Sequence, residues 1–127
     1  MTKVLVVDDD KESRDLLFEV LSTNGYSVAV VEDAAAARSL LETDRGYRIV
    51  IADLRMPNGT GLDLAADLRK GALKQEVILM SSFISGAERE LALELGVDAL
   101  IEKPFRLSEL LELVASLDGK RSVEISS

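Results

Sequence analysis

Cysteine and histidine are both missing from this sequence of 127 residues. Without cysteine there can be no disulfide and no thiolate metal ligand, and the lack of both residue types removes the usual ligands of a structural zinc ion. Any metal that this chain binds must therefore be held by oxygen atoms.

Positive charge is also scarce. The chain has 15 lysine and arginine residues against 23 aspartate and glutamate residues, a formal net charge of -8, and the basic residues form no cluster. An acidic surface repels phosphate backbones and anionic lipids, so we expect no direct nucleic-acid partner and no membrane partner.

Long apolar runs are absent as well. No stretch approaches the roughly 18 apolar residues of a membrane span, and Met1 leads into a strand-like pattern rather than a signal-type apolar region. We therefore expect a cytoplasmic protein.

The residues that are present predict one α/β domain. The chain is 47% hydrophobic, and a chain of this length can bury a fair core. Short β-branched runs alternate with longer stretches of helical spacing, which is typical of a parallel sheet covered on both faces. We expect strands at residues 3–7, 27–31, 48–52, 76–81 and 99–102, and helices at 11–24, 33–43, 61–70, 87–95 and 107–117.

Local signals support several helix ends. Asp33 is a candidate N-cap, Ser85 and Glu88 have the spacing of a capping box, and Gly25 and Gly96 stand where helices should stop. Residues 118–127 are polar and lack periodicity, so we expect a domain over residues 1–117 followed by a polar tail or the remnant of a linker.

Five βα units favour an open, doubly wound sheet over a closed barrel. Right-handed crossovers leave few topologies, and the flavodoxin-like strand order 2-1-3-4-5, with five helices on two faces, is the prediction. Ligands bind such sheets at the carboxyl ends of the strands, where the chain reverses direction, here between the first and third strands.

Polar residues follow the expected strands at that edge. Residues 8–10, three aspartates, end the first strand, Asp53 the third, Ser81 the fourth, and Lys103 with Pro104 the fifth. Crowded carboxylates favour a cation, and oxygen ligands suit Mg²⁺, so the sequence predicts an acidic pocket that binds Mg²⁺ and handles a phosphoryl group.

Each of these features has a simpler interpretation when it is taken alone. The three aspartates could cap a helix, Asp53 could be a loop carboxylate, Ser81 could be a satisfied hydroxyl at a strand end, and Lys103 could be a surface lysine before a turn. Their shared position at one sheet edge favours the functional interpretation.

With these residues in order, the chain resembles a receiver domain of the two-component response regulators. The matching motifs are Asp8 with Asp9 after an apolar strand, the stretch from Asp53 to Pro57 with Gly61, then Ser81, then Lys103 with Pro104 and Phe105. The resemblance implies that Asp53 accepts the phosphoryl group, that Asp8 and Asp9 form the acidic pair, that Ser81 is the switch hydroxyl, and that Lys103 binds the phosphoryl group. It also implies a cis peptide bond before Pro104.

The chemistry expected at this site needs these residue types. Asp9, Asp53 and the main-chain carbonyl of Arg55 would share Mg²⁺ or Mn²⁺, with Asp8 acting through water. The resemblance implies a phosphohistidine donor on a sensor histidine kinase or a phosphotransfer protein. We expect self-catalysed phosphoryl transfer and slow autodephosphorylation rather than an enzyme with its own substrate.

Signalling needs a second conformation, which the resemblance assigns to the segments after the fourth strand. Ser81 would move toward the phosphoryl group and alter the face made by residues 87–95, the fifth strand and the last helix. Leu100 stands where many receivers have Tyr or Phe, so it could slide inward as Ser81 moves, or the loop alone could carry the change. Phe83 could shield the phosphoryl group from water and slow its hydrolysis.

Several alternatives stay open. A phosphatase-type hydrolase would need Asp-x-Asp-x-Thr/Val where Glu12 now takes the fifth position, and a flavin or nucleotide carrier would need a glycine-rich or Ser/Thr-rich loop after the first strand. Within the family, the rival is a receiver-like scaffold that is never phosphorylated. The partner of the signalling face would be a downstream effector or a missing output domain, and the chain would be a monomer or a phosphorylation-linked dimer.

Overall fold

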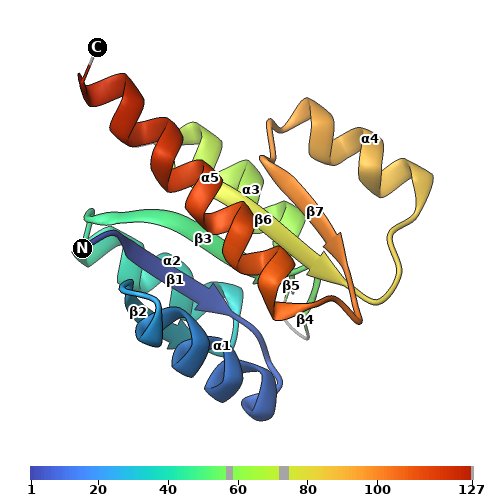
Figure 1. Cartoon of the computed structure of the whole chain (residues 1–127). Coiled ribbons are helices and arrows are strands. Elements are labelled where there is room, and N and C mark those ends of the chain that lie inside the picture. The colour runs from blue at the N-terminus through green and yellow to red at the C-terminus, as the bar shows by residue number, and fades with distance from the viewer. Residues whose placement is uncertain (57–58, 72–74, 127) are drawn as a thin grey trace.

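The computed structural model describes residues 1–56, 59–71 and 75–126 (Figure 1). Its five parallel strands lie in the order β2-β1-β3-β6-β7, which confirms the predicted doubly wound sheet. These strands are β1 (Lys3–Val7), β2 (Ser27–Val31), β3 (Tyr47–Asp53), β6 (Glu76–Ser81) and β7 (Ala99–Glu102). The helices are α1 (Lys11–Thr23), α2 (Ala34–Thr43), α3 (Gly61–Lys70), α4 (Gly86–Glu94) and α5 (Leu107–Ser126).

Alternating strand residues divide the core into two clusters, one on each face of the sheet. Leu5 and Val50 face the side covered by α2, α3 and α4, whereas Val4 and Ile49 face the side covered by α1 and α5. Apolar side chains make up both clusters, because the central strands β1, β3 and β6 are largely buried on both faces and successive side chains point in opposite directions.

Side-chain caps fix where the helices begin. The Asp33 carboxylate accepts a hydrogen bond from the Ala36 amide at 2.8 Å, and Ser85 and Glu88 form the predicted capping box. A second capping box joins Thr60 and Asp63 at the start of α3, and it has an acidic N3 residue that the sequence pattern did not single out.

The prediction was wrong about the end of the last helix. We expected it to stop at residue 117, but α5 continues to Ser126. Among the α5 side chains that the structure describes, Val114 is the last fully buried one, and Leu117 still packs partly buried against the core. The sequence beyond Leu117 shows no apolar periodicity, although the helical backbone continues. A role of residues 118–127 as a linker stays a prediction.

The structure also adds a short element that the sequence did not reveal. Two two-residue strands, β4 (Arg55–Met56) and β5 (Gly59–Thr60), pair antiparallel one residue after β3 ends at Asp53. They join β3 to α3 at the carboxyl edge of the sheet, and Pro57 of the predicted motif lies outside the described residues. Across the part of the chain that the structure describes, no helix is both long enough and apolar enough to cross a bilayer.

Candidate functional site

Three carboxylates meet at the carboxyl edge of the sheet. Asp8 and Asp9 follow β1, and Asp53 is the last residue of β3, the neighbouring strand. Each offers a carboxylate oxygen, and these oxygens all lie within 4.8 Å of one another. Asp8 is fully buried, while Asp9 is exposed, so the group opens to solvent on one side.

Short-range hydrogen bonds hold these carboxylates in place. Asp8 Oδ1 accepts from the Asp10 amide at 3.0 Å, and Asp53 Oδ1 accepts from the Arg55 amide at 3.0 Å. The backbone of Asp8 is itself tied down, because its amide donates to Val31 O at 3.1 Å and its carbonyl accepts from Arg14 at 2.8 Å.

The oxygen set fits a hard divalent cation. Asp8 Oδ2 is buried and has no hydrogen-bond partner among the described residues, which is costly for a carboxylate oxygen. Mg²⁺ prefers oxygen ligands in a small set with several waters, and three clustered carboxylates with one open side provide such a set. Asp8, Asp9 and Asp53 could therefore hold a metal.

Lys103 provides the positive charge of the site. Its Nζ lies 3.0 Å from Asp53 Oδ2 and 3.5 Å from Asp8 Oδ2. Burial acts to lower the pKa of Lys103, but the hydrogen bond to Asp53 and the charges of both aspartates outweigh it, so this pKa lies above its ordinary value of 10.5. Lys103 therefore stays charged at neutral pH, and its peptide bond to Pro104 is cis.

The Ser81 hydroxyl is turned toward the loop that follows β6. Ser81 is 2% exposed. Its hydroxyl donates to Phe83 O at 2.9 Å, and its Oγ accepts from the Phe83 amide at 3.3 Å. The single hydroxyl proton is therefore already used, and Ser81 must turn before it can donate to a group on Asp53.

The other two predicted switch residues lie in different surroundings. Leu100 on β7 is half-buried and packs against the core cluster beneath α2, α3 and α4. The Phe83 ring is 63% exposed and lies 6.0 Å from the Arg55 guanidinium. The shielding role of Phe83 and the sliding role of Leu100 stay predictions.

One side chain near the site was missed by the sequence analysis, which gave Arg55 only a main-chain role. The Arg55 guanidinium forms two hydrogen bonds to the Glu88 carboxylate, both at 2.9 Å, and one to Phe83 O at 3.0 Å. Such a pair joins two segments far apart in the sequence, and no local spacing could have indicated it.

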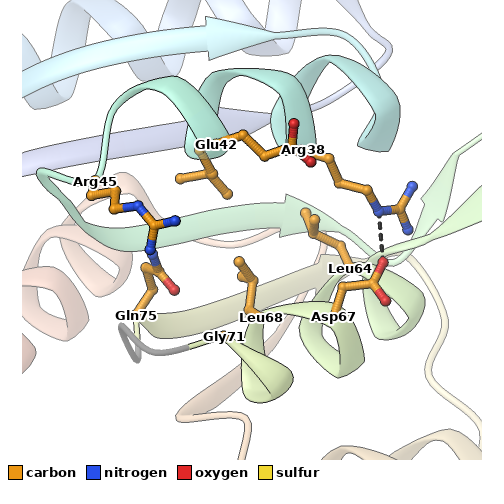
Figure 2. A pocket seen from close by; sticks show the side chains of 9 residues that line it. Arg38, Glu42, Arg45, Leu64, Asp67, Leu68, Gly71 and Gln75 are labelled. Atoms are coloured by element: carbon orange, nitrogen blue, oxygen red, sulfur yellow. Dashed lines mark hydrogen bonds and ion pairs between the residues drawn. The ribbon is translucent and has the colours of Figure 1, made fainter.

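A separate pocket lies between α2 and α3 (Figure 2). Its volume is about 300 Å³, and Leu41, Leu64 and Leu68 line it together with the ion pair between Arg38 and Asp67. None of the predicted site residues lines this pocket. The pocket is therefore separate from the acidic cluster at the edge of the sheet.

This fold and this edge define a flavodoxin-like α/β domain in which three carboxylates that could hold a metal lie beside a charged lysine. The chain belongs to the family of response regulator receiver domains, whose sequence model matches residues 4–115. As a receiver domain, it is the switch component of a two-component signalling system.

Individual relatives agree with this assignment. The response regulator MprA of Mycolicibacterium vanbaalenii is 36% identical over 115 residues, which cover 91% of this chain and 49% of the relative. The chain thus spans about half the length of the curated relatives that it matches.

Solved structures show the same fold. A response regulator receiver protein from Pseudomonas putida superposes with a TM-score of 0.86 at 33% identity, covering 91% of this chain and 96% of that one. A CheY-like receiver domain from Methanospirillum hungatei superposes with a TM-score of 0.89 at 25% identity, covering 96% and 98%.

Proposed function

We propose that this receiver domain is a phosphorylation-dependent switch whose phosphoryl acceptor is Asp53. The supporting observation is the surroundings of its carboxylate. Asp8 and Asp9 each offer an oxygen within 4.8 Å of an Asp53 oxygen, and Lys103 Nζ lies 3.0 Å from Asp53 Oδ2 and 3.5 Å from Asp8 Oδ2. Phosphoryl transfer depends on positioning and charge neutralisation, and these neighbours of Asp53 support the proposal on both counts.

In the proposed reaction an Asp53 oxygen attacks the phosphorus of a phosphohistidine. The new bond is carboxylate O–P, the N–P bond of the donor breaks, and the released imidazole leaves with the nitrogen lone pair. Lys103 would exchange Asp53 Oδ2 for a phosphoryl oxygen, which keeps its charge paired. When bound, Mg²⁺ would neutralise the crowded carboxylates and the phosphoryl oxygens. Asp8, Asp9, Asp53 and the carbonyl of Arg55 are the groups that would hold it.

The acyl phosphate would then act on the segments around it. Moving a population from 1:99 to 99:1 takes about 5.5 kcal/mol, and one hydrogen bond to a charged group supplies about 1.5–3 kcal/mol. Ser81 therefore needs Lys103 and loop amides acting with it. The altered surface would be the face made by α4, β7 and α5, and slow autodephosphorylation would reset it without a separate enzyme activity.

The partners are part of the same proposal. A sensor histidine kinase or a phosphotransfer protein would be the donor, and an effector or output domain would read the altered face. The proposal keeps the sequence-based expectations of a cytoplasmic location, no direct nucleic-acid or membrane partner, and a monomer or a phosphorylation-linked dimer.

The test is the intact mass after incubation with Mg²⁺ and acetyl phosphate. We expect one phosphoryl adduct in the chain without substitutions, none in the Asp53→Asn variant, and none after chelation of the metal. Asp67→Asn is a matched control, since Asp67 lies in an exposed ion pair on α3, and this variant should be modified normally. If the chain without substitutions takes up no phosphoryl group, the phosphorylation-independent scaffold is favoured.

A further inference from the structure

Arg55 connects the acceptor strand to two parts of the chain that follow β6. Its amide donates to Asp53 Oδ1 at 3.0 Å, and its guanidinium binds both Glu88 carboxylate oxygens on α4. The same guanidinium donates to Phe83 O at 3.0 Å. A two-pronged arginine pair with a third bond to a backbone carbonyl fixes orientation as well as distance.

The Phe83 carbonyl is shared between Arg55 and Ser81. It accepts the Ser81 hydroxyl proton at 2.9 Å and an Arg55 N–H at 3.0 Å. Because Arg55 holds this carbonyl in place, the Ser81 hydroxyl keeps an acceptor on the loop side. The hydroxyl can turn toward Asp53 only by giving up that acceptor.

Besides the Arg55 pair, the N-terminal half of α4 is attached by Ile84, which is buried just before the helix, and by the ion pair of Arg89 with Glu102 on β7. Of the α4 residues, all of which the structure describes, Ala92 alone is buried, whereas Leu91 and Leu93 are exposed. Glu88 closes the capping box with Ser85 and receives the Arg55 fork at the same time. An element with little buried apolar surface opens at low free-energy cost, so a polar contact at its end contributes a large share of that cost.

We propose that Arg55 is a positioning residue that holds the loop after β6 and the start of α4 in the arrangement where the Ser81 hydroxyl faces away from Asp53. This proposal rests on the proposed function of Asp53 and Ser81. Loosening the Arg55–Glu88 pair releases the Phe83 carbonyl and, through it, the hydroxyl. The pair thus sets how far the unphosphorylated chain samples the conformation that receives a phosphoryl group.

The expected effect is modest because the pair is partly exposed, with side-chain exposures of 50% for Arg55 and 22% for Glu88. Pairs of this kind shift an equilibrium by about two- to fivefold. A population shift of that size changes the rate of phosphoryl uptake by the same factor if the receptive conformation is the one that reacts.

Glu88→Gln is the sharpest variant, because the glutamine oxygen can still accept the Ser85 amide that closes the capping box. Arg55→Lys keeps the charge but loses the fork. Asp67→Asn is the matched control, since it breaks the Arg38–Asp67 pair at 2.6 Å on the surface away from the site.

Two readouts are compared in the full chain. The first is the initial rate of adduct formation with Mg²⁺ and acetyl phosphate. The second is the position of the Ser81 and Phe83 amide resonances, with beryllofluoride as an imitation of the phosphoryl group to mark the fully switched position. We expect Glu88→Gln and Arg55→Lys to react about two- to fivefold faster and to move these resonances toward the beryllofluoride position, and Asp67→Asn to match the unmodified chain.

Measurements in a Ser81→Ala background separate two explanations of a faster rate, namely an effect of Arg55 through the Ser81 hydroxyl and a general loosening of the fold. If Arg55 acts through Ser81, adding Glu88→Gln to Ser81→Ala changes the rate no further. Persisting acceleration in that background would overturn the proposal, and so would single variants that match the unmodified chain in both readouts. Failure of the proposed function would be distinguishable from failure of the Arg55 proposal. In that case the chain without substitutions would give no adduct and no response to beryllofluoride.

Discussion

Gly61 begins α3 and lies against the backbone at the end of β3. A Cβ atom at this position would lie 2.7 Å from the Asp53 carbonyl oxygen and 2.8 Å from Leu79 Cδ2. The Gly61 amide also donates to Leu54 O at 3.0 Å, so the backbone cannot move away without losing that bond. Glycine is required here by close approach.

We predict that Gly61→Ala destabilises the fold and weakens phosphoryl uptake, because the backbone of Asp53 must shift to admit the new methyl group. Overpacking of this kind costs about 1–3 kcal/mol, which urea unfolding measures. Gly86→Ala is the control, since a Cβ there meets nothing within 4 Å at the start of α4. Equal stability of the two variants would contradict this prediction.

The site was predictable from the sequence to the extent that strand ends determine it. Asp8 and Lys103 directly follow strands and Asp53 ends one, and parallel strands bring their carboxyl ends to one edge. The rotamer of Ser81 and the partner of Arg55 were not predictable. They depend on how the loops pack in three dimensions, which the hydrophobic periodicity of the sequence does not indicate.

At the scale of elements, Arg69 is a brace between helices. Its guanidinium, near the end of α3, donates to Leu95 O and Gly96 O at the end of α4, both at 2.8 Å. It also donates to Gln75 O at 2.8 Å ahead of β6. These carbonyls include unpaired C-terminal groups of α4, which an arginine is well suited to satisfy.

We predict that Arg69→Met lowers the free energy of unfolding by about 1–3 kcal/mol, because it leaves partly buried carbonyls without a donor. Thermal or urea unfolding measures the change. Arg38→Met, which loses only the half-exposed pair with Asp67, should cost less than about 1 kcal/mol. The prediction fails if both variants lose the same stability.

Element boundaries were predictable where side chains signal them and not elsewhere. Asp33 and Ser85 cap helices as their types suggest. The strands β4 and β5 are only two residues each and carry no period. The final turns of α5 are formed by a polar segment without apolar periodicity, so the sequence pattern gave no signal for them.

At the scale of the whole molecule, stability depends on two apolar layers that share one sheet. Leu110 of α5 is fully buried in the layer beneath α1 and α5. We predict that Leu110→Ala costs about 2–5 kcal/mol of unfolding free energy, through lost burial and the cavity left behind. Leu93→Ala on α4 should change it little, since that side chain is 79% exposed, and chemical denaturation of both variants checks the contrast.

The topology was predictable as a whole because few arrangements satisfy the pattern. Five alternating βα units need helices on both faces, and right-handed crossovers then restrict the strand order. The observed order β2-β1-β3-β6-β7 is the doubly wound solution.

The long final helix extends beyond the rest of the domain. Helix α5 has 20 residues, a length of about 30 Å at 1.5 Å per residue, and its C-terminal end projects past the sheet (Figure 1). A protein fused to that end would be held at a fixed rotational angle rather than on a flexible tether. Inserting one residue near that end of the helix would rotate the fused partner by about 100°, so the angle between receiver and partner could be set one residue at a time.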